Sequence, residues 1–185
     1  MAVDVRNNRF SPCCHVTKKH FEEYTTIEEY ENSEKLNKLQ DSFRKNERNA
    51  LCNYCWTNED NNVQSMRQSV LQDRQHSDLD AITQIKLHTG STCNLACMMC
   101  FPSVSSTWKK LWTETDPPEV FAKKAPELYD SETESYIKKN IAHIKYIETL
   151  GGEPLFSKRF LKLLNWIRSS GHSNNITLYI ITNAT

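Results

Sequence analysis

The stretch GSTCNLACMMCFP, residues 90–102, places Cys93, Cys97 and Cys100 within eight positions. Thiols that lie this close in a chain oxidise, cross-link or bind metal, so the stretch indicates a ligand. The preceding segment AITQIKLHTG, residues 81–90, has the pattern of a β-strand that runs into a loop. We therefore expect the three cysteines at the end of a strand, where α/β folds place their functional sites.

Three explanations of the spacing C-x3-C-x2-C remain open. Offsets of four and seven residues fall on one helical face, so the thiols could pack in a core as small apolar side chains. A structural zinc site usually takes four protein ligands, and the local set here is three. A four-iron cluster held by three thiolates keeps one iron open for a substrate, so an iron–sulfur cluster fits this set best.

The composition of the chain argues against several classes of protein. Lys plus Arg equals Asp plus Glu, 23 each in 185 residues, which gives no electrostatic reason to expect a nucleic-acid or membrane partner. The first residues lack the apolar core of a signal peptide, and the longest apolar run, ITLYIIT, is too short to span a bilayer. The chain has seven cysteines, and grouped cysteines in a reducing compartment point to metal or redox chemistry. We therefore expect a cytoplasmic protein that binds a metal.

From about residue 82 the sequence alternates between strand and helix patterns. After the first strand we expect a helix over residues 131–144, a strand ending in a glycine turn over 145–154, a helix stopped at Gly171, and a third strand over 174–185. This order predicts an α/β fold with parallel strands and right-handed crossovers. Because the third strand would leave an unpaired apolar edge, we expect either a fragment or a sheet that another chain completes.

The cysteine stretch and a second motif together resemble the radical S-adenosylmethionine (SAM) superfamily. LGGEP, residues 150–154, follows the second predicted strand, about fifty residues after the cysteines. Taken alone, this motif is also explained by a turn that needs a positive φ. The resemblance covers about residues 82–185 and implies the first half of a partial (β/α) TIM-like barrel.

The resemblance implies two cofactors and the residues that hold them. Cys93, Cys97 and Cys100 would ligate a [4Fe–4S] cluster whose open iron chelates SAM. The residues of the second motif would meet the SAM amino group: Gly151, Gly152, Glu153 and Pro154. Thr182 and Asn183, at the end of the third strand, would either touch the ribose or carboxylate of SAM or simply cap the strand.

The implied activity is that of a radical SAM enzyme. The reduced cluster would split SAM into methionine and a 5′-deoxyadenosyl radical, which abstracts a hydrogen atom from the substrate. The resemblance favours a peptide or protein substrate and a reductant such as flavodoxin or ferredoxin. It assigns no catalytic residue that touches the substrate.

The N-terminal region contains the other four cysteines, Cys13, Cys14, Cys52 and Cys55. A C-x2-C pair such as Cys52 and Cys55 fits zinc, a redox pair or an iron–sulfur cluster. The helical segment NSEKLNKLQDSFRKNE, which Asn32 or Ser33 could cap, precedes the pair.

This arrangement resembles the SPASM/Twitch extension of radical SAM enzymes, in which an upstream cysteine completes an auxiliary cluster. That extension usually follows the barrel, whereas here it precedes it. The resemblance implies three units: a small cysteine-rich auxiliary domain over residues 1–60, a linker over 61–81, and a radical SAM core over 82–185.

Two alternative functions stay open. One is a non-catalytic iron–sulfur or zinc-binding module for electron transfer, which would have no need of a pocket for the SAM amine. The other is a radical SAM enzyme that modifies RNA, against which the zero net charge and the missing basic stripe argue.

Overall fold

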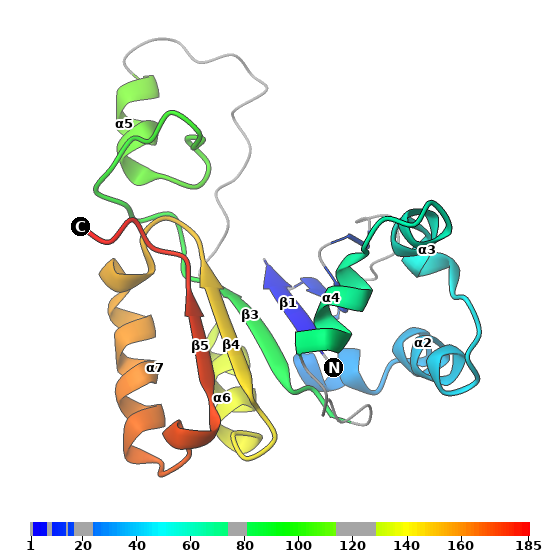
Figure 1. Ribbon diagram of the computed structural model, residues 1–185. Coiled ribbons are helices and arrows are strands. Elements are labelled where there is room, and N and C mark those ends of the chain that lie inside the picture. Colours follow the sequence, from blue (N-terminus) through cyan, green and yellow to red (C-terminus); the bar gives the residue numbers. More distant parts are fainter. Residues whose placement is uncertain (1, 7–8, 14, 17–23, 74–80, 114–128) are drawn as a thin grey trace.

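The computed structural model describes residues 2–6, 9–13, 15–16, 24–73, 81–113 and 129–185. These residues form a mixed α/β fold around one five-stranded sheet with the order β2-β1-β3-β4-β5 (Figure 1). The strands are β1 (Ala2–Arg6), β2 (Arg9–Ser11), β3 (Gln84–His88), β4 (Tyr146–Leu150) and β5 (Thr177–Ile180). The α-helices are α1 (Ile27–Glu31), α2 (Glu34–Arg44), α3 (Asn53–Asp60), α4 (Met66–Asp73), α5 (Ser106–Thr113), α6 (Ser131–Lys139) and α7 (Lys158–Ser169). Short 3₁₀ helices are η2 (Ala50–Cys52), η4 (Pro154–Phe156) and η5 (Ser173–Asn175).

The sheet is parallel except at β2, which pairs antiparallel with β1. Ile147 of β4 lies between Ile85 of β3 and Leu178 of β5. The predicted α/β class and the three predicted strands are therefore confirmed. Because β3, β4 and β5 are parallel, their carboxyl ends meet along one rim of the sheet, here called the carboxyl rim (residues 89–93, 151–154 and 181–183).

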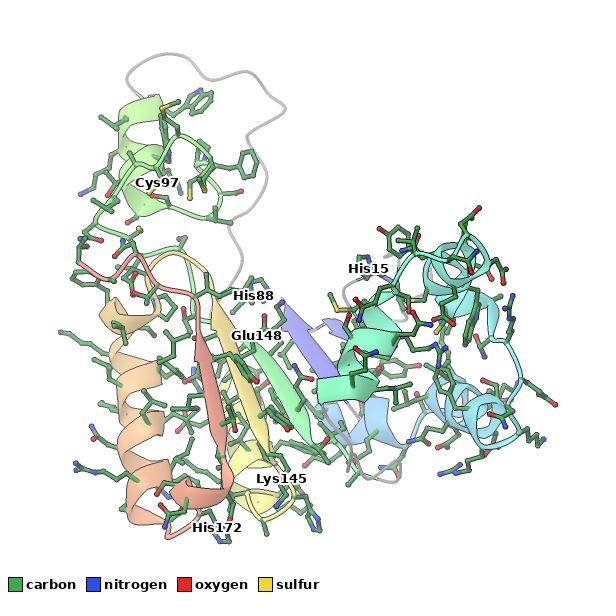
Figure 2. All side chains as sticks on the ribbon, viewed as in Figure 1. His15, His88, Cys97, Lys145, Glu148 and His172 are labelled. Carbon is green, nitrogen blue, oxygen red and sulfur yellow. The ribbon has the colours of Figure 1, made fainter. Side chains whose placement is uncertain are left out.

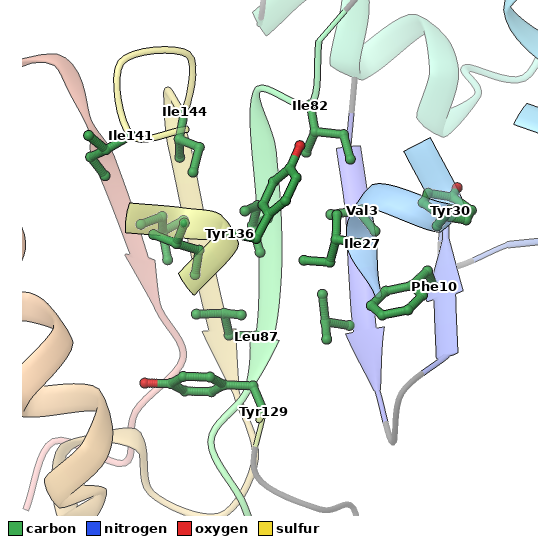
Figure 3. Packing of buried hydrophobic residues seen from close by; sticks show 14 of the residues in the cluster. Val3, Phe10, Ile27, Tyr30, Ile82, Leu87, Tyr129, Tyr136, Ile141 and Ile144 are labelled. Atoms are coloured by element: carbon green, nitrogen blue, oxygen red, sulfur yellow. The ribbon is translucent and has the colours of Figure 1, made fainter. Parts of the chain in front are cut away.

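The two faces of the sheet differ in chemistry because neighbouring side chains of a strand point to opposite sides. Ile85 and Ile147 are fully buried and share a core with Ile137 of α6 and Leu163 of α7. Figure 3 shows part of this cluster from close by, including Leu87 of β3 and Tyr136 of α6. Lys86 and Glu148 point to the other face, where they form an ion pair of 2.7 Å. That face is therefore polar at its centre.

The N-terminal strands are a feature that the sequence did not indicate. β1 pairs in parallel with β3. β3, which we expected to be the first strand, is therefore the middle strand of the sheet. Val3, Val5 and Phe10 lie in the same buried cluster as the residues of β3 and β4. The start of the predicted auxiliary unit over residues 1–60 thus shares its sheet and core with the rest of the described chain, while the predicted unit boundaries stay predictions.

The helix boundaries follow the capping residues. Ser33 caps α2 by accepting a hydrogen bond from the Leu36 N–H, which confirms one of the two expected caps. α6 ends at Lys139, earlier than the expected position 144, yet Ile141 and Ile144 remain buried in the turn that follows. The expected linker over residues 61–81 contains α4 in its described part.

We predict that Phe10→Ala lowers the free energy of unfolding of the whole described fold. Phe10 is only 2 % exposed, and truncating a buried phenylalanine costs about 3–5 kcal/mol. Urea unfolding should give one transition at a lower midpoint, whereas Phe101→Ala, at a side chain 55 % exposed, should change stability by about 0.5 kcal/mol or less. Two separate transitions, with only one of them shifted, would show that the N-terminal strands belong to an independent unit.

Candidate functional site

The three central cysteines lie in an irregular loop between β3 and α5, here called the cysteine loop (residues 91–101). Cys93, Cys97 and Cys100 are all half-buried and reduced, and none belongs to the hydrophobic core. The loop is not helical, so the explanation that they pack along one helical face is wrong. Met98 and Met99, which lie between Cys97 and Cys100 in the sequence, are almost fully exposed. The loop stands beyond the sheet, with Cys97 beside α5 (Figure 2).

The first turn of α5 holds the cysteine loop through side-chain hydrogen bonds. Thr107 Oγ1 and Ser106 Oγ donate to the carbonyl oxygen of Cys93 at 2.7 and 3.1 Å. Ser106 Oγ also accepts from the Cys93 N–H at 3.0 Å. Trp108 Nε1 donates to the carbonyl oxygen of Cys97 at 2.6 Å. Hydrogen bonds from α5 therefore fix the backbone at Cys93 and Cys97 without the help of a ligand.

The thiols of the cysteine loop influence one another. Burial, and then the neighbouring Cys97 and Cys93, raise the pKa of the Cys100 thiol above its ordinary value. The Cys100 thiol is therefore protonated at neutral pH, and a metal that binds it must displace its proton.

The thiols of the cysteine loop limit which metal could bind there. Among the described residues, no three His, Cys, Asp or Glu side chains form a group that could hold a metal ion. Thiolates are the donors that a four-iron cluster takes, and the cysteine loop has three cysteines. In donor chemistry the loop fits such a cluster.

The glycines of GGEP lie directly against the cysteine loop. The Gly152 N–H donates to the Gly90 carbonyl at 2.8 Å, and the Glu153 N–H donates to the Thr92 carbonyl at 2.7 Å. A Cβ atom on Gly152 would lie 2.3 Å from the Thr92 carbonyl oxygen, and one on Gly151 would lie 2.5 Å from that of Gly90. Gly151 also has φ +145°, a conformation that other residues rarely adopt. Backbone packing alone therefore requires both glycines.

Glu153 is buried, with 2 % of its surface exposed, and its carboxylate joins two strand ends. Oε1 accepts hydrogen bonds from the Leu155 N–H at 3.0 Å and from Thr182 Oγ1 at 2.8 Å. Oε2 accepts from the Asn183 N–H at 2.8 Å. A carboxylate offers about four acceptor positions, and hydrogen bonds among the described residues take three of them. Pro154, the first residue of η4, is also buried.

The ionisation of Glu153 follows from these contacts. Burial is the largest influence and raises the pKa of the carboxyl, but the hydrogen bonds from Asn183, Leu155 and Thr182 together lower the pKa below its ordinary value. Glu153 is therefore a carboxylate at neutral pH. Ionised carboxylates form their strongest hydrogen bonds with charged donors such as an ammonium group.

The third predicted segment also reaches the cysteine loop. Asn183 Nδ2 donates to Cys93 Sγ at 3.8 Å and to Asn94 Oδ1 at 3.0 Å. Asn94 Nδ2 in turn donates to Thr185 Oγ1 at 2.8 Å. The structure therefore brings the cysteine loop, the GGEP turn and the segment after β5 together at the carboxyl rim. The contacts of Asn94 and α5 were not expected from the sequence.

The N-terminal cysteines form a second group. Cys13 and Cys52 are half-buried, Cys55 is buried, and Cys14 lies outside the described residues. The rings of His15 and Tyr54 stack with centroids 4.4 Å apart, so the segment that follows Cys13 contacts the C-x2-C turn. In Figure 2, His15 lies on the side of α3 and α4, apart from Cys97.

Burial and the neighbouring thiol affect the C-x2-C pair. Both burial and the nearby Cys55 raise the pKa of Cys52, with burial the larger cause. Trp56 follows the pair and is covered by Arg67, whose guanidinium carbon lies 4.4 Å from the ring centroid. Arg67 also forms two hydrogen bonds to Glu59, at 3.0 and 2.5 Å, which attach α4 to α3. The pair thus lies in a region held by charge and ring contacts rather than in a free tail.

The chain matches no family model, no curated protein and no solved structure with which it was compared. The described residues contain no helix with the length and apolar character that crossing a membrane requires.

We predict that Gly152→Ala disturbs the cysteine loop. The added Cβ meets the backbone of Thr92, which cannot move aside as a flexible side chain would, and such overpacking costs about 1–3 kcal/mol. Urea unfolding measures the loss, and Trp108 fluorescence, recorded in a chain whose other three tryptophans are replaced by Phe, reports the displacement of the loop. Gly171→Ala is the control, because its φ of +81° costs about 1 kcal/mol but no atom lies within 4 Å of the new Cβ. Unchanged Trp108 fluorescence in Gly152→Ala would contradict the close packing.

We predict that the stability conferred by Glu153 depends on pH. Its pKa is lowered in the folded state, so its contribution is fully present above the ordinary value of 4.5 and is lost as the pH falls from there through the lowered value. The difference in unfolding free energy between wild type and Glu153→Gln should be constant near neutral pH and should shrink below about pH 4.5. Glu47→Gln, at an exposed position, is the control. A difference that does not change with pH would mean that Glu153 does not stabilise the fold as a carboxylate.

Proposed function

We propose that this chain is a radical SAM enzyme acting on a peptide or protein. The observation that supports this proposal is the meeting of three distant segments at the carboxyl rim. The Gly152 N–H bonds to Gly90 at the start of the cysteine loop, and Glu153 bonds to Thr182 and Asn183 after β5. A site for a cluster and a cationic cofactor needs these parts at one place.

Different residues at the rim would bind the cluster and SAM. Cys93, Cys97 and Cys100 would give their thiolates to a [4Fe–4S] cluster. Glu153, an ionised carboxylate held by three hydrogen bonds, would bind the amino group of SAM. When bound, the reduced cluster and SAM supply the 5′-deoxyadenosyl radical for hydrogen abstraction.

A partial TIM-like barrel is the finer fold that we propose. β3, β4 and β5 are neighbours in both sequence and sheet, and α6 and α7 share a buried core on one face. The opposite face, with Lys86 and Glu148, would then be the interior of the barrel. The carboxyl rim would be the end at which such barrels place their active sites.

For the N-terminal region we propose an auxiliary iron–sulfur cluster held by Cys13, Cys52 and Cys55, with Cys14 as a further candidate ligand. The contact between His15 and Tyr54 supports a shared site for the two cysteine segments. Zinc is the alternative ligand for the same thiols. An auxiliary cluster would either relay electrons from a reductant such as flavodoxin or ferredoxin or bind the peptide substrate.

A non-catalytic electron-transfer module is the second candidate, and one observation favours it. Three of the hydrogen-bond positions of Glu153 are used inside the protein, and both glycines of GGEP are required by backbone packing. The GGEP turn therefore has a structural function that does not depend on SAM. Only an assay of SAM cleavage separates the two candidates.

We predict that the chain, reconstituted anaerobically with iron and sulfide and then reduced with dithionite, converts SAM to 5′-deoxyadenosine. Cys97→Ala should abolish this product, because the cluster loses one of its three ligands. Met98→Ala is the matched control, since its side chain is exposed in the same loop and is not a proposed ligand. Product formation by Cys97→Ala would refute the site, and a reduced cluster without any product would favour the electron-transfer module.

The iron content of the same preparations gives the number of clusters per chain. About eight iron ions per chain would indicate two four-iron clusters, and about four would indicate one. Cys52→Ala should lose the iron of the auxiliary cluster and retain some uncoupled SAM cleavage. If Cys52→Ala leaves the iron content unchanged, the auxiliary cluster is not held by this thiol.

A further inference from the structure

Asn183 is the residue that connects the segment after β5 to a proposed cluster ligand. Its side-chain nitrogen Nδ2 lies 3.8 Å from Cys93 Sγ and 3.0 Å from Asn94 Oδ1. The two N–H bonds of the amide thus point to two acceptors in the cysteine loop.

The other end of the amide fixes its orientation. Asn183 Oδ1 accepts hydrogen bonds from the Thr185 N–H at 3.2 Å and from Thr185 Oγ1 at 2.9 Å. A side chain turned by 180° would place its oxygen toward Asn94 Oδ1 and its nitrogen toward the Thr185 N–H, so that like groups would meet on both sides. The nitrogen must therefore face Cys93.

Glu153 holds Asn183 in this position. Its Oε2 accepts from the Asn183 N–H at 2.8 Å, and its Oε1 accepts from the adjacent Thr182 at 2.8 Å. The carboxylate is buried and ionised, so these bonds are of the strong, charge-assisted kind. The segment is thereby fixed against the cysteine loop, and the Asn183 amide is presented to the sulfur.

We propose that Asn183 is a positioning residue that donates a hydrogen bond to Cys93 Sγ and raises the reduction potential of the cluster that Cys93 helps to hold, an inference that rests on the proposed function. A donor to a ligating sulfur stabilises the more negative, reduced state of a cluster. Sγ also accepts from the Leu95 N–H at 3.5 Å, which is a backbone donor. Substitution at Asn183 therefore removes one donor and leaves the other in place.

The test is a potentiometric titration of the reconstituted chain, followed by electron paramagnetic resonance of the reduced cluster. At a fixed applied potential we expect the ratio of reduced to oxidised cluster to be about fivefold lower in Asn183→Leu, the effect of losing one net hydrogen bond. Asn183→Asp should lower it as well, because it keeps the shape and the acceptor side of the asparagine but lacks the N–H donors.

Asn174→Leu is the matched control, since this exposed asparagine precedes the opposite end of β5. Its ratio should equal that of the wild type. A ratio unchanged in Asn183→Leu and Asn183→Asp would overturn the proposal, as would an equal fall in Asn174→Leu. A merely structural function of Asn183 would change the amount of cluster bound and leave the ratio unaffected.

A second measurement uses the chain prepared without iron, so that it does not depend on the cluster. Hydrogen exchange at the Leu95 amide should be about fivefold faster in Asn183→Leu than in Asn174→Leu, because the sulfur that Leu95 binds is less well held. Equal exchange in both variants would refute the contact. A wild-type chain that takes up no iron would count against the proposed function alone, and the exchange comparison would still decide whether Asn183 holds Cys93.

Discussion

The arrangement at the carboxyl rim depends on one buried carboxylate. An ionised carboxylate away from water is costly unless hydrogen bonds replace the lost solvation. Glu153 receives three such bonds, one from within its own turn and two from the segment after β5. The buried charge therefore forces two strand ends into a fixed relation. Because the Glu153 N–H is also bonded to the Thr92 carbonyl, the cysteine loop joins the same arrangement.

The sequence predicted those elements in which apolar residues recur at a regular period and a capping or turn residue marks an end. β3, β4, β5, α6 and α7 each combine an apolar period with a cap or a glycine turn, and all five were expected. β1 and β2 lie in the stretch AVDVRNNRFS, in which charged and polar residues separate Val3, Val5 and Phe10, so the stretch was not distinguished from a polar tail. The pairing of β1 with β3 joins positions about eighty residues apart, and no local pattern reports such a contact.

At the site, the sequence indicated which residues gather but not how they contact one another. The cysteine spacing and GGEP gave the loop and the turn, and the parallel strand order gave their shared rim. The hydrogen bonds from Ser106 and Thr107 to Cys93 were missed, because a serine and threonine run at the start of a helix is an ordinary capping pattern. The donation from Asn183 to Cys93 was missed because polar side chains take their partners from the folded arrangement.

The structural and the ligand-binding explanations of GGEP are compatible in physical terms. A carboxylate that is already fixed by three protein hydrogen bonds does not reorganise when a cation binds it, and such preorganised groups bind charge most effectively. In the proposed function, the hydrogen bonds that hold the turn would also prepare it for an ammonium group. Measurements of unfolding free energy therefore test how this turn is held in the fold. The proposed chemistry of the rim must be tested by cofactor binding and by cleavage of SAM.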